Sequence, residues 1–201
     1  MLLDPEDSQL LLVDYQARLM PAVHEGAAVQ QNAVRLAQIA KLLDVPVWGT
    51  EENPQGLGPL VPDVRELCRK VLVKTHFSAV AEGLVDLLRP PMRQQAGNAR
   101  SLPKHLQKRQ PEPEEGRSSI VVAGCETHVC LLQTALDLID EEFDVWVVTD
   151  ACGSRTEKNR DAAFDRLAAA GCELVTTEMV AFEWIRSSEH EAFKDVLRLI
   201  K

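Results

Sequence analysis

The chain is short of positive charge. Its 22 Lys and Arg residues stand against 31 Asp and Glu residues, which gives a formal net charge of -9 over 201 residues. Affinity for nucleic acid comes mainly from Lys and Arg contacts to phosphates, so this balance argues against a nucleic-acid partner. The sequence also has no apolar stretch near the roughly 20 residues that a membrane-spanning helix needs. We therefore expect neither a nucleic-acid partner nor a membrane anchor.

The N-terminus lacks the basic residues that precede the apolar stretch of a secretory signal peptide, since "MLLDPEDSQLLL" is acidic. The five cysteines are an odd number, which does not suit a disulfide framework. Both features favour a reduced, cytoplasmic protein. With 45% hydrophobic residues the chain can bury a full core, and its length predicts one domain over residues 1–201.

Short apolar runs alternate with helical patterns along the chain. The runs are nearly continuous in hydrophobicity, as in strands buried on both faces of a parallel sheet. They cover residues 8–14, 45–50, 70–74, 118–124, 144–150 and 172–177. Between them apolar residues recur at helical spacing, as at Val29, Ala33, Leu36, Ala40 and Leu43, and at Leu131, Ala135, Leu138 and Ile139. Right-handed crossovers then predict an α/β fold, a three-layer α/β/α sandwich around a six-stranded parallel sheet of the Rossmann-like kind.

Residues 89–118 break this alternation. They hold five of the 11 prolines, few large apolar residues, and a basic stretch followed by "EPEE". Such a segment buries too little apolar surface to order itself strongly. We expect a flexible surface insertion here, with a lid or a partner-binding arm as the functional alternatives.

Three chemically different side chains lie where predicted strands end. Asp14 ends the first run, Lys74 ends the third, and Cys130 follows the fourth at the start of a helix. Ligands of open parallel sheets bind beyond the carboxyl ends of the strands. Taken singly, an Asp turn, a solvated Lys and a buried Cys are ordinary structural features. Together, an acid, an amine and a thiol favour a reactive site.

The stretch "AGCETHVC" allows other interpretations. A zinc site would use Cys125, His128 and Cys130, but the usual two-cluster spacing is absent. A redox pair of Cys125 and Cys130 lacks the C-x-x-C spacing, although it stays a weaker alternative. The remaining cysteines lie in or beside apolar runs and are expected in the core: Cys68, Cys152 and Cys172.

Three blocks carry a resemblance to a known family. In this order, "LLLVDYQ", "VKTHFSAV" and "VVAGCETHVCLLQTALDL" resemble the signature blocks of the isochorismatase-like cysteine hydrolases, a superfamily that includes nicotinamidases and N-carbamoylsarcosine amidohydrolase. "GTEENPQGLGPLVPDV" resembles its metal-free isochorismatase-domain branch. The resemblance covers nearly the whole chain outside 89–118. It implies the isochorismatase fold, a homo-oligomer, a small-molecule substrate and no cofactor.

The resemblance also implies roles for individual residues. The family's catalytic Asp, Lys and Cys fall on Asp14, Lys74 and Cys130. Its cis peptide falls between Cys125 and Glu126, and its oxyanion hole uses the backbone N–H groups of Glu126 and Cys130. Cys125 is then not the nucleophile.

Elementary chemistry adds an expectation about the thiol. Cys130 lies at a helix N-terminus with Lys74 nearby, and both would lower its pKa. Asp14 would take the proton, Lys74 would orient and stabilise charge, and the thiolate would attack a carbonyl to give a thioester-type intermediate.

The substrate is less defined. Nicotinamidases carry a metal cluster after the second strand, whereas 50–64 contains no histidine, so we expect no metal. Leu19 stands where relatives often have an aromatic residue, and Tyr15 and Phe77 are candidate pocket walls. By the same resemblance, the presence of Cys130 favours hydrolysis of an amide or carbamoyl C–N bond. The alternative is a catalytically idle member that acts as an oligomeric interaction protein.

Overall fold

The computed structural model describes residues 2–89 and 116–201, so most of the predicted insertion at 89–118 lies outside the described residues. The strands are β1 (Ser8–Val13), β2 (Val47–Glu52), β3 (Lys70–Lys74), β4 (Ser119–Gly124), β5 (Asp144–Val148) and β6 (Glu173–Val175). The helices are α1 (Gly26–Leu42), α2 (Pro54–Leu57), α3 (Pro62–Arg65), α4 (Leu84–Leu88), α5 (Leu132–Asp140), α6 (Glu157–Ala169), α7 (Thr177–Ile185) and α8 (Phe193–Ile200), and a π-helical turn, η5 (Thr127–Leu131), leads into α5.

The six strands form one sheet in the order β3-β2-β1-β4-β5-β6, and every neighbouring pair is parallel. The chain builds outward from β1 in one direction and from β4 in the other. The strand order therefore reverses between β1 and β4, and open α/β sheets bind ligands at this switch point. The predicted fold class and the six-stranded parallel sheet are confirmed.

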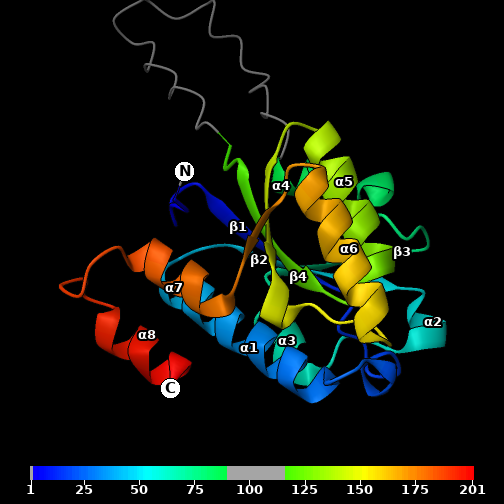
Figure 1. Cartoon of the computed structure of the whole chain (residues 1–201), viewed down its shortest axis with the longest axis horizontal. Helices are drawn as coiled ribbons and strands as arrows, with labels where there is room; N and C mark the ends of the chain where they lie inside the picture. Colours follow the sequence, from blue (N-terminus) through cyan, green and yellow to red (C-terminus); the bar gives the residue numbers. More distant parts are fainter. Residues whose placement is uncertain (1, 90–115) are drawn as a thin grey trace, which may run out of the picture.

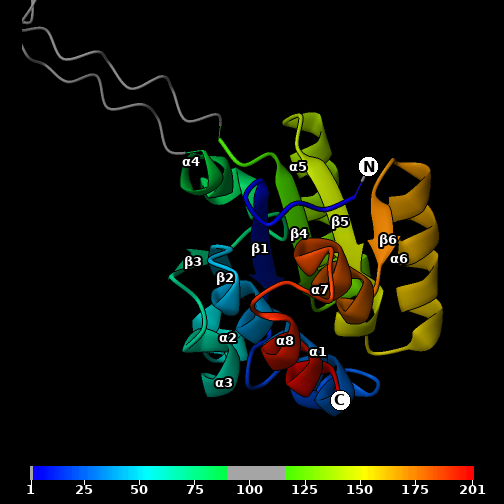
Figure 2. The same cartoon turned by 90° about the vertical axis from the view of Figure 1, so that its left-hand side faces the viewer.

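Helices cover both faces of the sheet, as Figures 1 and 2 show. The long helix α1 packs with α7 and α8 on one face, and α5 packs with α6 on the other. Within the described ranges, no helix combines the length and the apolar content needed to cross a membrane.

The apolar pattern of the sequence explains this packing. β1 and β4 are buried at every position, as their continuous hydrophobicity predicts. In α1 the predicted core positions Val29, Ala33, Leu36 and Ala40 are all buried, and in α5 Ala135 and Leu138 are. Each buried Leu or Val side chain contributes about 1.5–3 kcal/mol by leaving water.

One strand is displaced along the chain from its predicted position. The apolar run 45–50 placed the end of the second strand at Thr50, but β2 runs from Val47 to Glu52. Its ladder with β3 continues to the pair of Glu52 and Lys74. The prediction ended too early because "TEE" is polar, and a search for apolar runs stops there. A strand whose end lies in a functional site can end in polar residues. The displacement brings Glu52 to the carboxyl edge of the sheet.

Close contact between β1 and β4 generates a test of this architecture. A Cβ on Gly124 would lie 2.5 Å from the carbonyl oxygen of Val13 and 2.6 Å from its Cβ. The backbone of β1 cannot retreat without opening the central ladder. We expect Gly124→Ala to lower the free energy of unfolding by about 1–3 kcal/mol. Urea denaturation would measure this change.

Gly56→Ala is the matched control. A Cβ there meets only the side-chain amide of Asn53, at 2.8 Å, and that amide can rotate away. Its effect should stay within about 0.5 kcal/mol. Equal destabilisation by the two substitutions would contradict the close β1–β4 packing.

Candidate active site

Four strand ends bring a cluster of reactive side chains together at the switch point. Asp14 follows β1, Glu52 ends β2, Lys74 ends β3, and Cys130 lies in the turn after β4. All four are buried, with Lys74 exposed by only 1%. The structure thus brings the three predicted residues together and adds Glu52 between them.

Lys74 is the centre of the cluster. Its Nζ lies 2.8 Å from Asp14 Oδ2 and 2.9 Å from Glu52 Oε2. It also donates to the backbone carbonyls of Phe77 at 3.0 Å and His76 at 3.3 Å. Burial alone would lower the pKa of Lys74, but the charges of Asp14 and Cys130 and the hydrogen bonds to Asp14 and Glu52 outweigh it and raise the pKa. Lys74 is therefore a fixed cation.

Asp14 is held by its backbone and by one neighbour. Its φ is 53°, in the left-handed region that Asp tolerates better than most residues, and this turns the chain sharply out of β1. Thr50 Oγ1 donates to Asp14 Oδ1 at 2.7 Å. One carboxylate oxygen is thus occupied by Thr50, while the other faces Lys74. The carboxylate is also close enough to the Cys130 thiol for its charge to raise the pKa of that thiol.

The Cys130 thiol is not activated as its sequence position predicted. Burial first, and then the charge of Asp14, raise its pKa to about 12, and the opposing effect of Lys74 is too small to offset them. The expected lowering of the pKa is wrong because desolvation of a thiolate at 6% exposure exceeds the attraction of one ammonium already shared with two carboxylates. The resting residue is a thiol.

The turn between β4 and Cys130 has an unusual backbone. The peptide bond between Cys125 and Glu126 is cis. The chain is fixed on either side of it, because Cys125 N–H donates to Val13 at 3.0 Å and Thr127 N–H donates to Gly153 at 2.8 Å. The N–H of Glu126 itself has no acceptor among the described residues. A free backbone donor thus lies four residues before Cys130.

The Glu126 side chain ties this turn to the loop after β5. Arg155 donates to its carboxylate from Nε at 2.9 Å, from NH2 at 2.7 Å and from the backbone N–H at 2.9 Å. Hydrogen bonds from Arg155 hold the pKa of Glu126 below its ordinary value against the effect of burial. Three donors on one carboxylate fix the orientation of the turn. Nothing in the local sequence pairs Glu126 with Arg155, so this clamp was not predictable.

The predicted pocket residues differ in position. Tyr15 is fully buried and its hydroxyl donates to the carbonyl of Ala151, so it belongs to the core and not to a pocket wall. Leu19 is partly buried against the core. Phe77 is 52% exposed, and its carbonyl accepts from Lys74, so it lies at the mouth of the site. Cys125 is fully buried, which raises its pKa well above its ordinary value.

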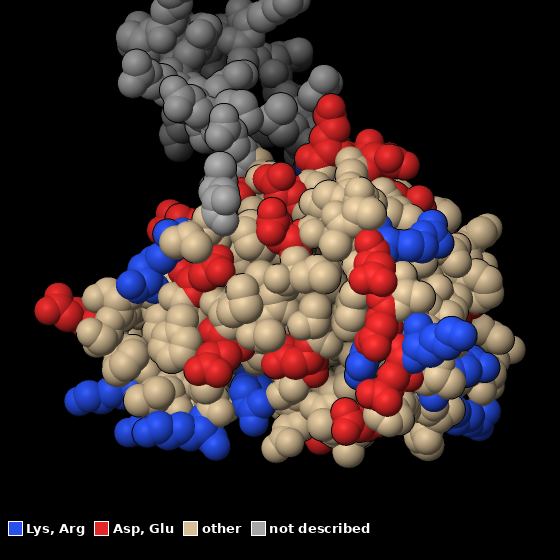
Figure 3. Space-filling view, in the orientation of Figure 1, with Lys and Arg blue, Asp and Glu red and all other residues tan. Residues whose placement is uncertain are grey.

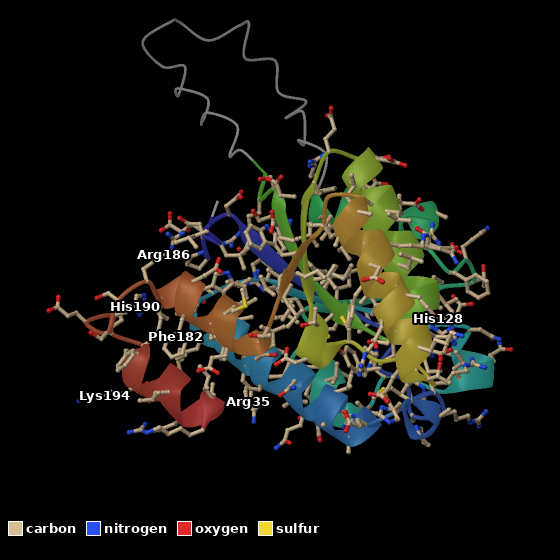
Figure 4. The ribbon with its side chains drawn as sticks, viewed as in Figure 1. Arg35, His128, Phe182, Arg186, His190 and Lys194 are labelled. Atoms are coloured by element: carbon tan, nitrogen blue, oxygen red, sulfur yellow. The ribbon has the colours of Figure 1, made fainter. Side chains whose placement is uncertain are left out.

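The two histidines nearest the site are engaged separately. His76 Nδ1 lies 2.8 Å from Glu82 Oε1 on the exposed loop after β3. His128 lies beside α6 (Figure 4), with Nδ1 3.0 Å from Ser154 Oγ and Nε2 3.3 Å from Asn159 Nδ2. Each histidine has protein partners of its own, so the structure does not bring the two together.

Glu52 is the site residue that the sequence analysis missed. Its backbone N–H and carbonyl pair with the side-chain amide of Gln16, both at 2.9 Å, which locks the end of β2 against the chain leaving β1. The signal that could have found it is its place at the carboxyl end of a parallel strand. A second strand predicted two residues longer, to Glu52, would have placed this carboxylate at the sheet edge with Asp14 and Lys74.

Comparison with known proteins identifies the family. A model of the "Isochorismatase domain" matches residues 8–179. The chain is 35% identical over 197 residues to "Isochorismatase domain-containing protein 2" of Rattus norvegicus, an alignment that covers 98% of this chain and 82% of the relative. With an acid, an amine and a thiol at the switch point of a parallel sheet, the fold is that of an isochorismatase-like hydrolase. The chain belongs to the isochorismatase domain family.

Solved structures show the same architecture at 28% identity. "MAR1 Ribonuclease from Caenorhabditis elegans" has a TM-score of 0.83 and covers 100% of this chain and 92% of its own. YcaC from Pseudomonas aeruginosa, described with covalent acrylamide, has a TM-score of 0.81 with 98% and 91% covered. YcaC from Escherichia coli, described as an octameric hydrolase of unknown specificity, has a TM-score of 0.79 with 100% and 95% covered.

The raised pKa of Cys130 leads to a prediction about its reactivity. The charge of Asp14 raises this pKa, so Asp14→Asn should lower it and increase the thiolate fraction at neutral pH. We expect iodoacetamide labelling of Cys130 to become at least about tenfold faster, the effect of one pKa unit. Peptide mass mapping would measure the rate, with Cys130→Ser to verify the assignment. Unchanged or slower labelling would contradict the proposed contact.

Proposed function

We propose that the protein hydrolyses the C–N bond of a small amide or carbamoyl compound through a covalent intermediate on Cys130. One observation carries this proposal: the Asp14 carboxylate lies 2.8 Å from a buried ammonium, Lys74, and its charge raises the pKa of the buried Cys130 thiol beside it. A nucleophile, a base and a fixed cation in one buried cluster are the parts that acyl transfer requires.

The first half-reaction forms the covalent intermediate. Asp14 takes the thiol proton as the Cys130 sulfur attacks the substrate carbonyl carbon, and the carbonyl oxygen becomes an oxyanion. The backbone N–H groups of Glu126 and Cys130 stabilise that oxyanion. When the intermediate collapses, the C–N bond breaks and Asp14 returns its proton to the leaving nitrogen. Ammonia or an amine departs, and a thioester-type carbonyl stays on the sulfur.

The second half-reaction restores the resting state. Asp14 takes a proton from water as the water oxygen attacks the thioester carbonyl. The new oxyanion rests on the same two N–H groups. Collapse breaks the C–S bond, the acid product leaves, and Asp14 returns the proton to the Cys130 sulfur. Lys74 keeps its proton throughout and stabilises the carboxylate form of Asp14, to which it is paired at 2.8 Å.

A resting thiol is compatible with this cycle. Burial raises the pKa of Cys130 to about 12, so little thiolate exists before the substrate binds. Asp14 lies beside the thiol and its charge already acts on it, so proton transfer and attack on carbon can occur together. The charge that leaves sulfur then appears on the carbonyl oxygen, where the two backbone donors lie. The proposal therefore needs a positioned base and does not need a low thiol pKa.

Two neighbours support parts of this proposal. The Pseudomonas aeruginosa YcaC carries covalent acrylamide, which in that protein requires a reactive nucleophile. The Escherichia coli YcaC is octameric. By this likeness we propose that the present chain also forms a homo-oligomer.

Two competing functions have to be separated from hydrolysis of a C–N bond. An idle member acting as an oligomeric interaction protein has no use for Asp14, Lys74 and Cys130 held in contact. The Caenorhabditis elegans neighbour is named as a ribonuclease. The formal charge of -9 disfavours RNA binding, and acidic side chains interrupt the basic ones across the face in Figure 3.

A substrate panel tests these alternatives together. The panel combines small amides and N-carbamoyl compounds, read by ammonia release, with a labelled RNA read by gel, and uses Cys130→Ala as the blank. Ammonia release above the blank supports the proposal. Silence on every amide and carbamoyl compound together with RNA cleavage would favour the ribonuclease, and silence throughout would favour the interaction protein.

Substitution of the two cysteines should separate their roles. We expect Cys130→Ala to remove turnover by at least about a thousandfold, because the covalent step is lost. Cys125→Ala should retain most activity, since Cys125 is fully buried and its main contact is a backbone bond to Val13. Ammonia release at matched protein concentration measures both. An active Cys130→Ala with an inactive Cys125→Ala would overturn the assignment.

Turnover should be independent of added metal. The carboxylates of Asp14 and Glu52, the ligands that a cation would use at this sheet edge, are already paired with Lys74 at 2.8 and 2.9 Å. An ammonium thus occupies the position between them. We expect exhaustive EDTA treatment to leave ammonia release unchanged. Loss of activity that one added divalent metal restores would contradict this.

A further inference from the structure

Glu52 gives the site a second carboxylate that the hydrolytic cycle does not use. Its Oε2 lies 2.9 Å from Lys74 Nζ. Within the described residues the only cation paired with Asp14 and Glu52 is Lys74. Two carboxylates and one ammonium leave a formal charge of one negative unit beside Cys130.

That negative charge does not disappear during the reaction. With a Cys130 thiol, the negative units are Asp14 and Glu52 and the positive unit is Lys74. After the thiol proton moves to Asp14, the negative units are the sulfur and Glu52. The sum is the same in both states, so a substrate meets one excess negative charge at every step before the oxyanion forms.

Glu52 is placed to meet the substrate. Its side chain is 10% exposed, whereas those of Asp14 and Lys74 are 0% exposed, so it is the one of these three charged groups that reaches solvent. Lys74 binds Oε2, and no described residue donates to Oε1. The double pairing of its backbone with Gln16 fixes the strand end that carries this side chain. Glu52 Oε1 is thus an acceptor without a protein donor among the described residues.

We propose that Glu52 makes the site selective for uncharged or cationic amides and against substrates that carry a carboxylate near the scissile bond. Its open oxygen accepts an N–H of the substrate, and its charge repels an anionic group. This inference rests on the proposed function and narrows it to a substrate class. It assigns Glu52 as a specificity-determining residue.

Alkylation of Cys130 tests the charge without needing a substrate. Iodoacetamide and iodoacetate react alike, since sulfur bonds to carbon and iodide leaves, but only iodoacetate is anionic. We expect the iodoacetamide-to-iodoacetate rate ratio at Cys130 to exceed that of N-acetylcysteine, and to fall roughly three- to tenfold in Glu52→Gln, the effect of one nearby charge in a partly solvated site. A change in thiolate fraction alters both rates equally and cancels in the ratio.

Glu82→Gln is the matched control. It removes the same formal charge from a side chain held by His76 on the exposed loop, outside the cluster. Peptide mass mapping at alkaline pH follows Cys130 alone. A ratio that changes in Glu52→Gln and stays constant in Glu82→Gln supports the proposal. Equal ratios in all three proteins, equal changes in both variants, or no labelling of wild-type Cys130 by either reagent would overturn it.

Turnover gives the second readout. Succinamide, succinamate and β-alaninamide carry the same amide beside a neutral, an anionic and a cationic group. We expect wild-type kcat/KM to be lowest for succinamate, and Glu52→Gln to narrow the gap. Preference for succinamate would overturn the selectivity while leaving hydrolysis established. Silence on all three, with the alkylation ratio as expected, would instead place the failure in the hydrolytic proposal.

Discussion

A lysine ammonium buried between two carboxylates is the interaction on which this site depends. An isolated buried ammonium is costly by several kcal/mol, and the pairing of Lys74 with Asp14 and Glu52 offsets that cost only if the geometry is good. The carbonyls of His76 and Phe77 complete its shell. Because the three side chains come from the ends of β1, β2 and β3, the cluster also fixes those strand ends against one another. The ion pairs that neutralise Lys74 therefore also hold the ends of β1, β2 and β3 in register.

The same constraint sets the state of the nucleophile. Lys74 shares its charge between two carboxylates, so little of it remains to stabilise a Cys130 thiolate, and burial decides the pKa. In the proposed cycle, such a thiol stays protonated until a carbonyl oxygen can accept the displaced charge. Activation in that cycle depends on the position of Asp14 and the backbone donors rather than on a preformed ion pair. Selectivity for the correct electrophile follows from that arrangement.

The sequence was sufficient for the sheet and for three of the four cluster residues, and the reasons are physical. Buried parallel strands are continuously apolar, and Asp14, Lys74 and Cys130 stand out as polar residues where such runs stop. Glu52 did not stand out in this way, because β2 ends in two acidic residues, which a prediction based on apolar runs assigns to a loop. The pairing of Glu126 with Arg155 and the burial of Tyr15 depend on contacts between distant segments. The thiol pKa depends on desolvation, which a linear sequence does not reveal.

The two halves of the sheet contribute different groups to the cluster. The half built from β1, β2 and β3 supplies Asp14, Lys74 and Glu52, the proposed base, the cation and the second carboxylate. The half that begins at β4 supplies Cys130 and the turn at Glu126, which Arg155 clamps from the loop after β5. Asp14, which follows β1, and Cys130, which follows β4, come together because β1 pairs with β4. The switch point of the sheet therefore brings the thiol to the carboxylate that we propose takes its proton.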